Sequence, residues 1–302
     1  MARHLNICNA GTPQASCPDD KHRGTLSTAL KQAYTQLEQF ASAKLDAEIL
    51  LAHLLNRTRG YLYGWPDTIL SRPRLQEYQR LIERRAEGEP IAYLIGRREF
   101  WSMDLVVSRE TLVPRPDTET LVEQALARIP AAGAWRIVDL GSGCGAIALA
   151  IASARPRCEV FATDLFPATL KVARDNVRRM AINNMYLLLG DWCSPLRLRS
   201  TDLIVCNPPY IAQDDVHLLS DGVRFEPRKA LASGPDGLQD LRTLIRQATT
   251  VLRPGGWLLM EHGYAQGPAV EALLEAGGYT EIMDYPDSAG NPRVMACQSP
   301  VA

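Results

Sequence analysis

The chain has 302 residues, 46% of them hydrophobic and 22% charged, and its 33 Lys and Arg nearly balance its 34 Asp and Glu. This composition is typical of globular proteins, and it excludes disordered, collagen-like and membrane-embedded classes. A net charge of -1 gives no general sign of nucleic-acid binding, because neutralised phosphates supply most of that affinity and require a basic surface. The length predicts one large domain together with a smaller one.

Neither a membrane segment nor a secretory signal is visible in the sequence. No run reaches the roughly 18 apolar residues that cross a bilayer, and the N-terminus lacks the apolar region of a signal peptide. The seven cysteines are scattered, without a C-x-x-C pair or a His at ligand spacing. We therefore expect a cytoplasmic protein with reduced thiols, no bound metal and no membrane contact.

The first part of the chain is predicted to contain a tail and a helical domain. Residues 1–24 show no hydrophobic periodicity, which predicts a flexible tail. Apolar residues recur at helical spacing over 26–40, and further helices are predicted over 46–56 and from Ser71. Residues 25–95 are therefore predicted to form a small helical domain.

The remaining sequence predicts a β-hairpin followed by an α/β domain. Residues 96–113 are aromatic or β-branched around a polar middle, which is typical of a hairpin linker. Within 114–302, short apolar runs alternate with helical patterns, as expected for parallel strands that are buried on both faces and joined by crossover helices. The predicted fold class is α/β, with a doubly wound sheet. The runs that predict strands cover residues 135–140, 158–164, 185–191, 202–207 and 256–262.

A glycine-rich segment, DLGSGCGAIALA, follows the first predicted strand. Gly141, Gly143 and Gly145 allow a sharp turn and a close approach of the backbone to a ligand. Asp164 ends the second strand about 20 residues later, where its carboxylate can accept both hydroxyls of a ribose. Trp192, after the third strand, offers an apolar face to a purine. The alternatives are a tight turn without a ligand and a Trp packed under a loop, but together the features favour a nucleoside site.

The segment CNPPY, residues 206–210, follows the fourth predicted strand and ends it with two prolines. The Asn207 side chain and the Pro208 carbonyl are acceptors that can hold the two protons of a planar NH2 group, while Tyr210 stacks on its plane. Such a nitrogen is a weak nucleophile, since its lone pair is delocalised, so it needs a reactive electrophile. The sulfonium methyl of S-adenosylmethionine fits this need and requires a nucleoside site. The alternative is a rigid turn that only ends the strand.

Together these motifs resemble class I S-adenosylmethionine-dependent methyltransferases that modify amide or exocyclic amine nitrogens. The matching segments are VDLGSGCGAIALA, TDLFPATLKVARDN, GDW and NPPY, in this order. More narrowly, residues 25–297 are similar to the release factor glutamine methyltransferases, the PrmC or HemK family. That likeness rests on PIAYLIGRREFW, LVPRPDTETLVE, EPRKALASGPDGL and LRPGGWLLMEHGYAQG.

The resemblance implies methyl transfer from S-adenosylmethionine to the side-chain amide nitrogen of the glutamine in the Gly-Gly-Gln motif of class 1 peptide chain release factors. The helical domain would help to dock the release factor, and the hairpin and residues 114–119 would shape the pocket. Asn207, Pro208 and Tyr210 would act in catalysis. By motif position, the cofactor site comprises Gly141, Ser142, Gly143, Cys144, Gly145, Asp164, Trp192 and Asn207, and the substrate site comprises Asn207, Pro208, Pro209, Tyr210, Arg115 and Glu119.

Three alternatives stay open at this point. A methyltransferase for a glutamine of a large-subunit ribosomal protein shares NPPY, but the form of LVPRPDTETLVE favours the release-factor family. A DNA adenine methyltransferase uses a similar clamp but would need a target-recognition domain and a basic cleft. A binding module without catalysis would not need an intact Asn207 and Tyr210. Nothing in the sequence demands more than a monomer or direct contact with nucleic acid, and the role of His262 is left open.

Overall fold

The computed structural model describes residues 24–301 and separates into two compact units, one ending at Ala86 and the other beginning at Glu87. The predicted flexible tail, residues 1–24, lies outside the described residues apart from its last residue. The predicted hairpin segment, residues 96–113, groups with the second unit. Each unit has its own buried core.

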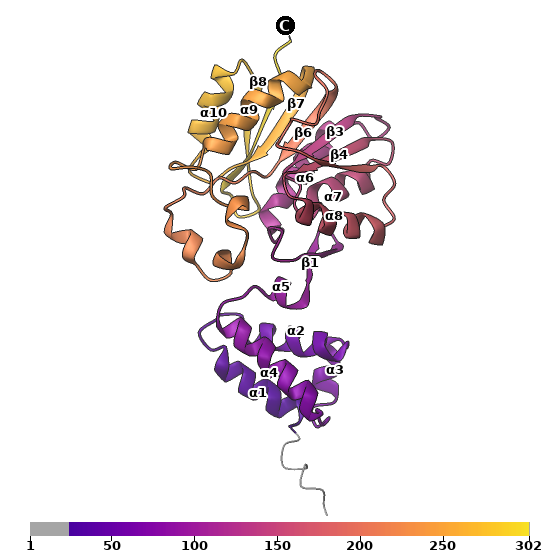
Figure 1. Cartoon of the computed structure of the whole chain (residues 1–302), viewed down its shortest axis with the longest axis vertical. Coiled ribbons are helices and arrows are strands. Elements are labelled where there is room, and N and C mark those ends of the chain that lie inside the picture. Colours follow the sequence, from indigo (N-terminus) through magenta and orange to yellow (C-terminus); the bar gives the residue numbers. More distant parts are fainter. Residues whose placement is uncertain (1–23, 302) are drawn as a thin grey trace, which may run out of the picture. The chain divides into compact units, whose positions relative to one another are not determined.

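The first unit is a small bundle of helices, as the hydrophobic spacing predicted (Figure 1). Thr25 caps its first helix, because the side-chain oxygen accepts a hydrogen bond from the Thr28 backbone N–H at 3.3 Å. Leu26, Leu50 and Tyr78 are buried on three of the helices. The third helix was not predicted, since only one of its six residues is buried. The helices are α1 (Leu26–Gln36), α2 (Ala43–Leu55), α3 (Arg59–Gly64) and α4 (Arg72–Ala86).

A seven-stranded sheet forms the centre of the second unit (Figure 1). Its strands are β3 (Arg136–Leu140), β4 (Glu159–Asp164), β5 (Met185–Leu189), β6 (Thr201–Cys206), β7 (Leu252–Glu261), β8 (Thr280–Pro286) and β9 (Pro292–Gln298). They lie in the order β5-β4-β3-β6-β7-β9-β8; the first five are parallel, and β9 is antiparallel to both of its neighbours. The parallel strands match the five predicted runs. The last two strands were not predicted, and β8 is an edge strand with mostly exposed residues.

Helices cover both faces of this sheet, which confirms the predicted doubly wound α/β class (Figure 1). They are α6 (Glu119–Arg128), α7 (Ala146–Ala154), α8 (Pro167–Arg179), α9 (Gln239–Val251) and α10 (Gly267–Ala276). Successive side chains of a strand point to opposite faces, so Ile137 of β3 shares a core with α6, α7 and α8, and Val138 shares a core with α9 and α10. Among residues 24–301, no helix is both long and apolar enough to cross a membrane.

Smaller elements precede the sheet in the second unit. Helix α5 (Ile91–Ile95) leads into the antiparallel strands β1 (Arg97–Phe100) and β2 (Met103–Val106), and a 3-10 turn, η2 (Pro116–Thr118), leads into α6. The carboxyl ends of the parallel strands meet at one edge of the sheet, where β3 has β4 on one side and β6 on the other. Open parallel sheets bind ligands at such a point, where the strand order reverses.

Candidate active site

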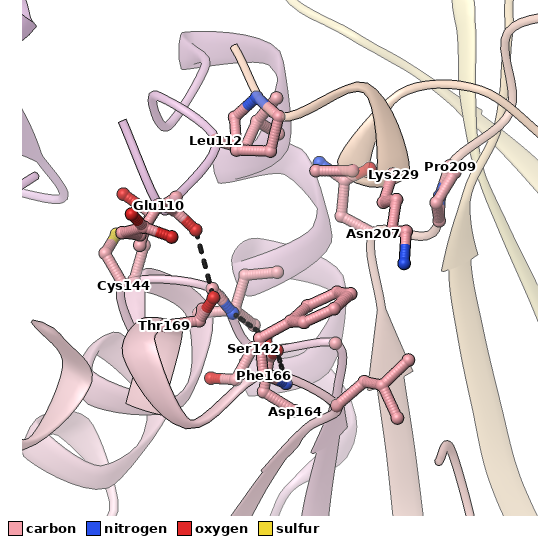
Figure 2. A pocket seen from close by; sticks show the side chains of 18 of the residues that line it. Glu110, Leu112, Ser142, Cys144, Asp164, Phe166, Thr169, Asn207, Pro209 and Lys229 are labelled. Carbon is pink, nitrogen blue, oxygen red and sulfur yellow. Dashed lines mark hydrogen bonds between the residues drawn. The ribbon is translucent and has the colours of Figure 1, made fainter. Parts of the chain in front are cut away.

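A cavity of about 350 Å³ opens at this edge of the sheet. Its wall includes the glycine loop after β3 and the residues that follow β4 and β6 (Figure 2). The segment after the hairpin, from Glu110 to Pro114, and a loop around Lys229 contribute further wall residues. Small-molecule sites commonly have volumes of about 300–1,000 Å³. The predicted site residues that line the cavity are Gly141, Ser142, Gly143, Cys144, Asp164, Trp192, Asn207 and Pro209.

The glycine loop turns the chain from β3 into α7 through left-handed backbone angles. Gly141, Gly143 and Gly145 have φ values of 69°, 61° and 87°, a region that residues with a Cβ seldom adopt. A Cβ on Gly141 would lie 3.1 Å from the Trp192 ring, whereas a Cβ on Gly143 would meet no atom of residues 24–301 within 4 Å. Gly143 therefore exposes its backbone to the cavity, so a bound molecule can approach it closely.

Asp164 ends β4 next to the glycine loop. Its carboxylate accepts a hydrogen bond from the backbone N–H of Gly143 at 3.1 Å and from that of Phe166 at 3.0 Å. Burial raises the pKa of Asp164, and these backbone hydrogen bonds act in the opposite direction. Each carboxylate oxygen has a further lone pair. The side chain can therefore accept the hydroxyls of a ribose while it orders the loop.

Two side chains of the glycine loop are held by the fold. The Ser142 hydroxyl donates to the Asp139 carboxylate at 2.7 Å, and the same carboxylate oxygen accepts from the Ala148 backbone N–H at 3.2 Å. The Cys144 thiol is buried, which raises its pKa to about 12 and keeps it neutral. The loop therefore offers a ligand chiefly its backbone.

The NPPY segment follows β6 directly. The Asn207 side-chain NH2 donates to the Thr118 hydroxyl at 3.2 Å, and within residues 24–301 no hydrogen-bond donor contacts Asn207 Oδ1. The Tyr210 hydroxyl donates to the buried Glu261 carboxylate at 3.0 Å. In Figure 2, Asn207 and Pro209 border the same cavity as Asp164. Asn207 Oδ1 is thus an acceptor beside the predicted nucleoside site, without a donor in the described part of the chain.

Arg115 and Glu119 support neighbouring segments and do not line the cavity. The Arg115 guanidinium pairs with the buried Glu226 carboxylate. The Glu119 carboxylate accepts from the Trp101 backbone N–H at 2.9 Å, which ties α6 to the turn of the hairpin. The other predicted residues outside the wall are Gly145, Pro208 and Tyr210. Gly145 is the N-cap residue that precedes α7, and Pro208 and Tyr210 flank Pro209.

The structure adds wall residues that sequence reasoning missed. The Phe166 ring lies 5.0 Å from the Lys229 ammonium, which comes from a loop far along the chain. Thr118 lies in the PRPDTE segment, yet no local pattern indicated that its hydroxyl meets Asn207. The TDLF sequence after β4 was the available signal for Phe166. The remaining additions include Glu110, Leu112, Thr169 and Asp240.

His262, whose role the sequence left open, is fully buried after β7. Its Nδ1 lies 2.9 Å from the Gly263 carbonyl oxygen, and its Nε2 lies 3.1 Å from the Asp284 carboxylate. Each ring nitrogen therefore lies within hydrogen-bond distance of a protein oxygen, and the side chain does not line the cavity. His262 therefore has a structural role and is not part of the candidate site.

The cavity suits S-adenosylmethionine. An acceptor carboxylate at Asp164, an indole face at Trp192 and open backbone at Gly143 surround it at the carboxyl edge of a doubly wound sheet, where such sheets bind nucleotides. The antiparallel β9 between β7 and β8 completes the mixed seven-stranded sheet. Fold and site together define a class I S-adenosylmethionine-dependent methyltransferase.

Comparisons with known proteins narrow this class. Residues 28–96 match the PrmC N-terminal domain family, and residues 117–223 match the methyltransferase small domain family. A crystal structure of a methyltransferase from Pyrococcus furiosus shares the fold, with a TM-score of 0.50 and 18% identity, over 72% of this chain and 97% of that chain.

Two curated relatives are more similar in sequence. The release factor glutamine methyltransferase of Vibrio cholerae is 48% identical over 277 residues, which cover 91% of this chain and 96% of that protein. The Escherichia coli K12 protein of the same name is 46% identical over 265 residues, which cover 88% of this chain and 95% of that protein. The chain belongs to the release factor glutamine methyltransferase family, as the motifs predicted.

Proposed function

We propose that the protein transfers a methyl group from S-adenosylmethionine to the side-chain amide nitrogen of the glutamine in the Gly-Gly-Gln motif of class 1 peptide chain release factors. The observation that carries this proposal is the Asn207 side chain, whose NH2 donates to Thr118 while its Oδ1 meets no donor among residues 24–301. The names of the relatives support the same substrate. Such methylation would modulate translation termination.

The clamp prepares the nitrogen for reaction. Asn207 Oδ1 and the Pro208 carbonyl accept the two amide protons, which holds the nitrogen in place and stabilises the positive charge that develops on it. The rings of Tyr210 and Pro209 would lie against the plane of the substrate amide. Bound S-adenosylmethionine supplies a methyl group that is already activated by a positive charge. The nitrogen lone pair would form the N–C bond, the sulfur would keep the electron pair of the broken S–C bond and leave as S-adenosylhomocysteine, and the nitrogen would then release one proton. The protein therefore needs no strong general base before the methyl group is transferred.

The remaining roles follow from the same proposal. Residues 141–145, Asp164, Trp192 and Asn207 hold the cofactor, and Asn207 to Tyr210 hold the substrate amide. The match of residues 28–96 to the PrmC N-terminal domain supports a docking role for the helical unit. We infer that the enzyme acts in the cytoplasm as a monomer, on a protein substrate and without direct contact with nucleic acid.

The assay of this proposal uses purified protein, labelled S-adenosylmethionine and a class 1 release factor. We expect label in the release factor and none in its Gly-Gly-Gln→Gly-Gly-Ala variant. Mass spectrometry of a tryptic digest locates the methyl group, because the proposal requires one added methyl on that glutamine. Equal labelling of the variant, or labelling of a ribosomal protein or of DNA instead, would contradict the proposal.

Asn207→Ala tests the clamp. The change removes one acceptor for the amide protons, so we expect kcat to fall by about 100-fold or more, by analogy with the loss of one positioned hydrogen-bonding group in other enzymes. Cofactor affinity, measured by calorimetry, should fall much less. Asn183→Ala, in an exposed position before β5, is the matched control and should keep wild-type kcat. An unchanged rate in Asn207→Ala would refute the clamp.

A further inference from the structure

Glu261 is a buried carboxylate that joins two parts of the active site. It is only 1% exposed and lies at the end of β7. Its Oε2 accepts a hydrogen bond from the Thr118 hydroxyl at 2.7 Å, and its Oε1 accepts one from the Tyr210 hydroxyl at 3.0 Å. Thr118 in turn meets Asn207. Asn207, Thr118, Glu261 and Tyr210 thus form one chain of hydrogen bonds, which we call the Glu261 relay.

The direction of each hydrogen bond in the relay follows from the available protons. A threonine hydroxyl has one proton, and Thr118 uses it to donate a hydrogen bond to the Glu261 carboxylate, which has no proton to donate. Towards Asn207, Thr118 can therefore act only as an acceptor. The Asn207 amide must then present its NH2 to Thr118, at 3.2 Å, and its Oδ1 must point elsewhere. The carboxylate thus determines which end of the amide is left for another molecule.

This orientation matters for a substrate that is itself an amide. The NH2 group of a substrate glutamine needs an acceptor. If the oxygen and the NH2 of Asn207 changed places, a donor would face this NH2 group, and the clamp would have one acceptor fewer. An unassisted asparagine has no strong reason to prefer one orientation, since its O and NH2 are nearly the same size. A partner with a defined donor direction removes this ambiguity.

We propose that Glu261 is a positioning residue which, through the Thr118 hydroxyl, fixes Asn207 with its Oδ1 available for the substrate amide and, through the Tyr210 hydroxyl, fixes the adjacent aromatic ring. This inference rests on the proposed function, because it assigns the relay to the binding of an NH2 group. Glu261 does not touch the cavity, so it acts through Thr118 and Tyr210.

The charged surroundings of Glu261 suit this role. Burial raises its pKa, while the hydrogen bonds from Thr118 and Tyr210 and the nearby Arg293 guanidinium lower it; Asp117 and the Cys206 thiol are the other titratable groups that interact with it. Burial also raises the pKa of Tyr210, which therefore stays a donor. As the pH falls through the raised pKa of Glu261, the carboxyl gains a proton and ceases to be an obligate acceptor.

The test compares Thr118→Val, which keeps the shape but removes the hydroxyl, with Thr118→Ser, which keeps the hydroxyl, and with Glu261→Gln. With a class 1 release factor as substrate, we expect Thr118→Val and Glu261→Gln to lower kcat by about 10- to 100-fold, with cofactor affinity within about threefold of wild type. Thr118→Ser should recover most of the rate. The double variant should be no slower than the slower single variant, because both changes break one relay.

A matched control and a pH profile separate positioning from general damage. Thr249→Val removes a hydrogen-bonded hydroxyl on α9, outside the cavity wall, and should keep wild-type kcat. Wild-type kcat should decline on the acid side as Glu261 is protonated, and Glu261→Gln should lack this decline. A Thr118→Ser variant as slow as Thr118→Val, or additive effects in the double variant, would overturn the relay.

A readout without catalysis distinguishes failure of the relay from failure of the proposed function. The 15N-labelled side-chain NH2 of Asn207 should give NMR signals that shift in Thr118→Val and in Glu261→Gln but stay close to wild type in Thr118→Ser. Unmoved signals in the first two variants would overturn the inference even if the release factor is methylated. Shifted signals with no methylation of any release factor by the wild-type protein would instead reject the proposed function.

Discussion

Asp139 is the penultimate residue of β3, just before the glycine loop, and its carboxylate is fully buried. Its Oδ2 accepts hydrogen bonds from Ser142 and Ala148, whereas its Oδ1 is buried without a partner among residues 24–301. Burial raises the pKa of Asp139 from 3.8 to about 7. Between these two values the folded protein holds a proton that the unfolded chain releases.

This difference predicts the pH dependence of stability. Because the folded state binds more protons in this window, the contribution of Asp139 to the free energy of unfolding falls as the pH rises from about 4 to about 7. We expect Asp139→Asn, which cannot ionise, to remove this fall, which amounts to a few kcal/mol because one pKa unit corresponds to about 1.4 kcal/mol. Urea unfolding at a series of pH values, followed by tryptophan fluorescence, measures the change.

The exposed Asp214→Asn is the matched control for this prediction and should keep the wild-type pH dependence. Asp139→Asn places an NH2 group at the position of the unpartnered Oδ1. An unpaired buried polar group costs about 1–3 kcal/mol, so we expect a lower free energy of unfolding for this variant at every pH. The prediction concerns the slope alone. A slope equal to that of the wild type would mean that Asp139 is ionised in the folded protein at neutral pH.

At the scale of elements, the loop between β6 and α9 completes the cavity without regular secondary structure. It contains only short 3-10 turns, and the last of them brings Lys229 to the wall. The Ile211 N–H donates to the Leu231 carbonyl at 2.9 Å, and the Ser233 N–H donates to the Ile211 carbonyl at 2.8 Å, so the loop returns to the NPPY segment. The turns are η3 (Val216–Leu219), η4 (Val223–Phe225) and η5 (Arg228–Ala230).

Gly237 near the end of this loop tests the contact with NPPY. Its φ is 74°, and a Cβ at this position would lie 2.4 Å from the Tyr210 carbonyl oxygen. Gly255 has a similar φ of 73°, but a Cβ there would meet no atom of the described residues within 4 Å. We expect Gly255→Ala to cost about 1–2 kcal/mol for the left-handed angle alone. Gly237→Ala should cost about 1–3 kcal/mol more, since the backbone has to move apart.

Thermal unfolding and kcat together check this pair. Gly237→Ala should also lower kcat, because the backbone displaced by the new Cβ carries the clamp, whereas Gly255→Ala should leave kcat near wild type. Equal losses of stability in the two variants would show that the close approach to the Tyr210 carbonyl does not affect the free energy of unfolding.

Prediction of elements from sequence succeeded for most strands that are buried on both faces, although β9 was missed despite four consecutive buried residues. Strands such as β6 are buried along their length and therefore appear as continuous apolar runs. The edge strand β8 and the short helix α5 lack such a pattern, because β8 exposes most of its residues and α5 has only five. Tertiary pairing with β9 supplies the hydrogen bonds that make β8 a strand.

At the scale of the whole molecule, the chain carries two units with separate cores. All residues of the two cores around the sheet lie between Ala92 and Cys297, within the second unit. We therefore expect residues 87–302 to bind S-adenosylmethionine with an affinity close to that of the full chain. Without the helical unit, KM for the release factor should rise by about tenfold or more, because the docking contacts are lost. A loss of about 1.4 kcal/mol in binding free energy corresponds to a tenfold weaker affinity.

Calorimetry with the cofactor and steady-state methylation of the release factor measure these two effects. The full chain, assayed beside the truncated one, is the reference. If KM stayed unchanged, the helical unit would have no docking role. If the truncated chain lost cofactor binding while still folded by circular dichroism, the site would depend on residues before Glu87.

The local sequence alone was sufficient to predict the kind of reaction that this protein catalyses. Consecutive residues encode the glycine loop, the acid that ends β4 and the NPPY segment, because each is a short stretch at the carboxyl end of a buried strand. The orientation of Asn207 depends instead on Thr118, which lies 89 residues earlier in the chain, and Thr118 depends on Glu261, which lies 143 residues after Thr118. Hydrogen bonds between segments so far apart leave no periodic or local pattern, so the relay exists only once the sheet has brought its carboxyl ends together.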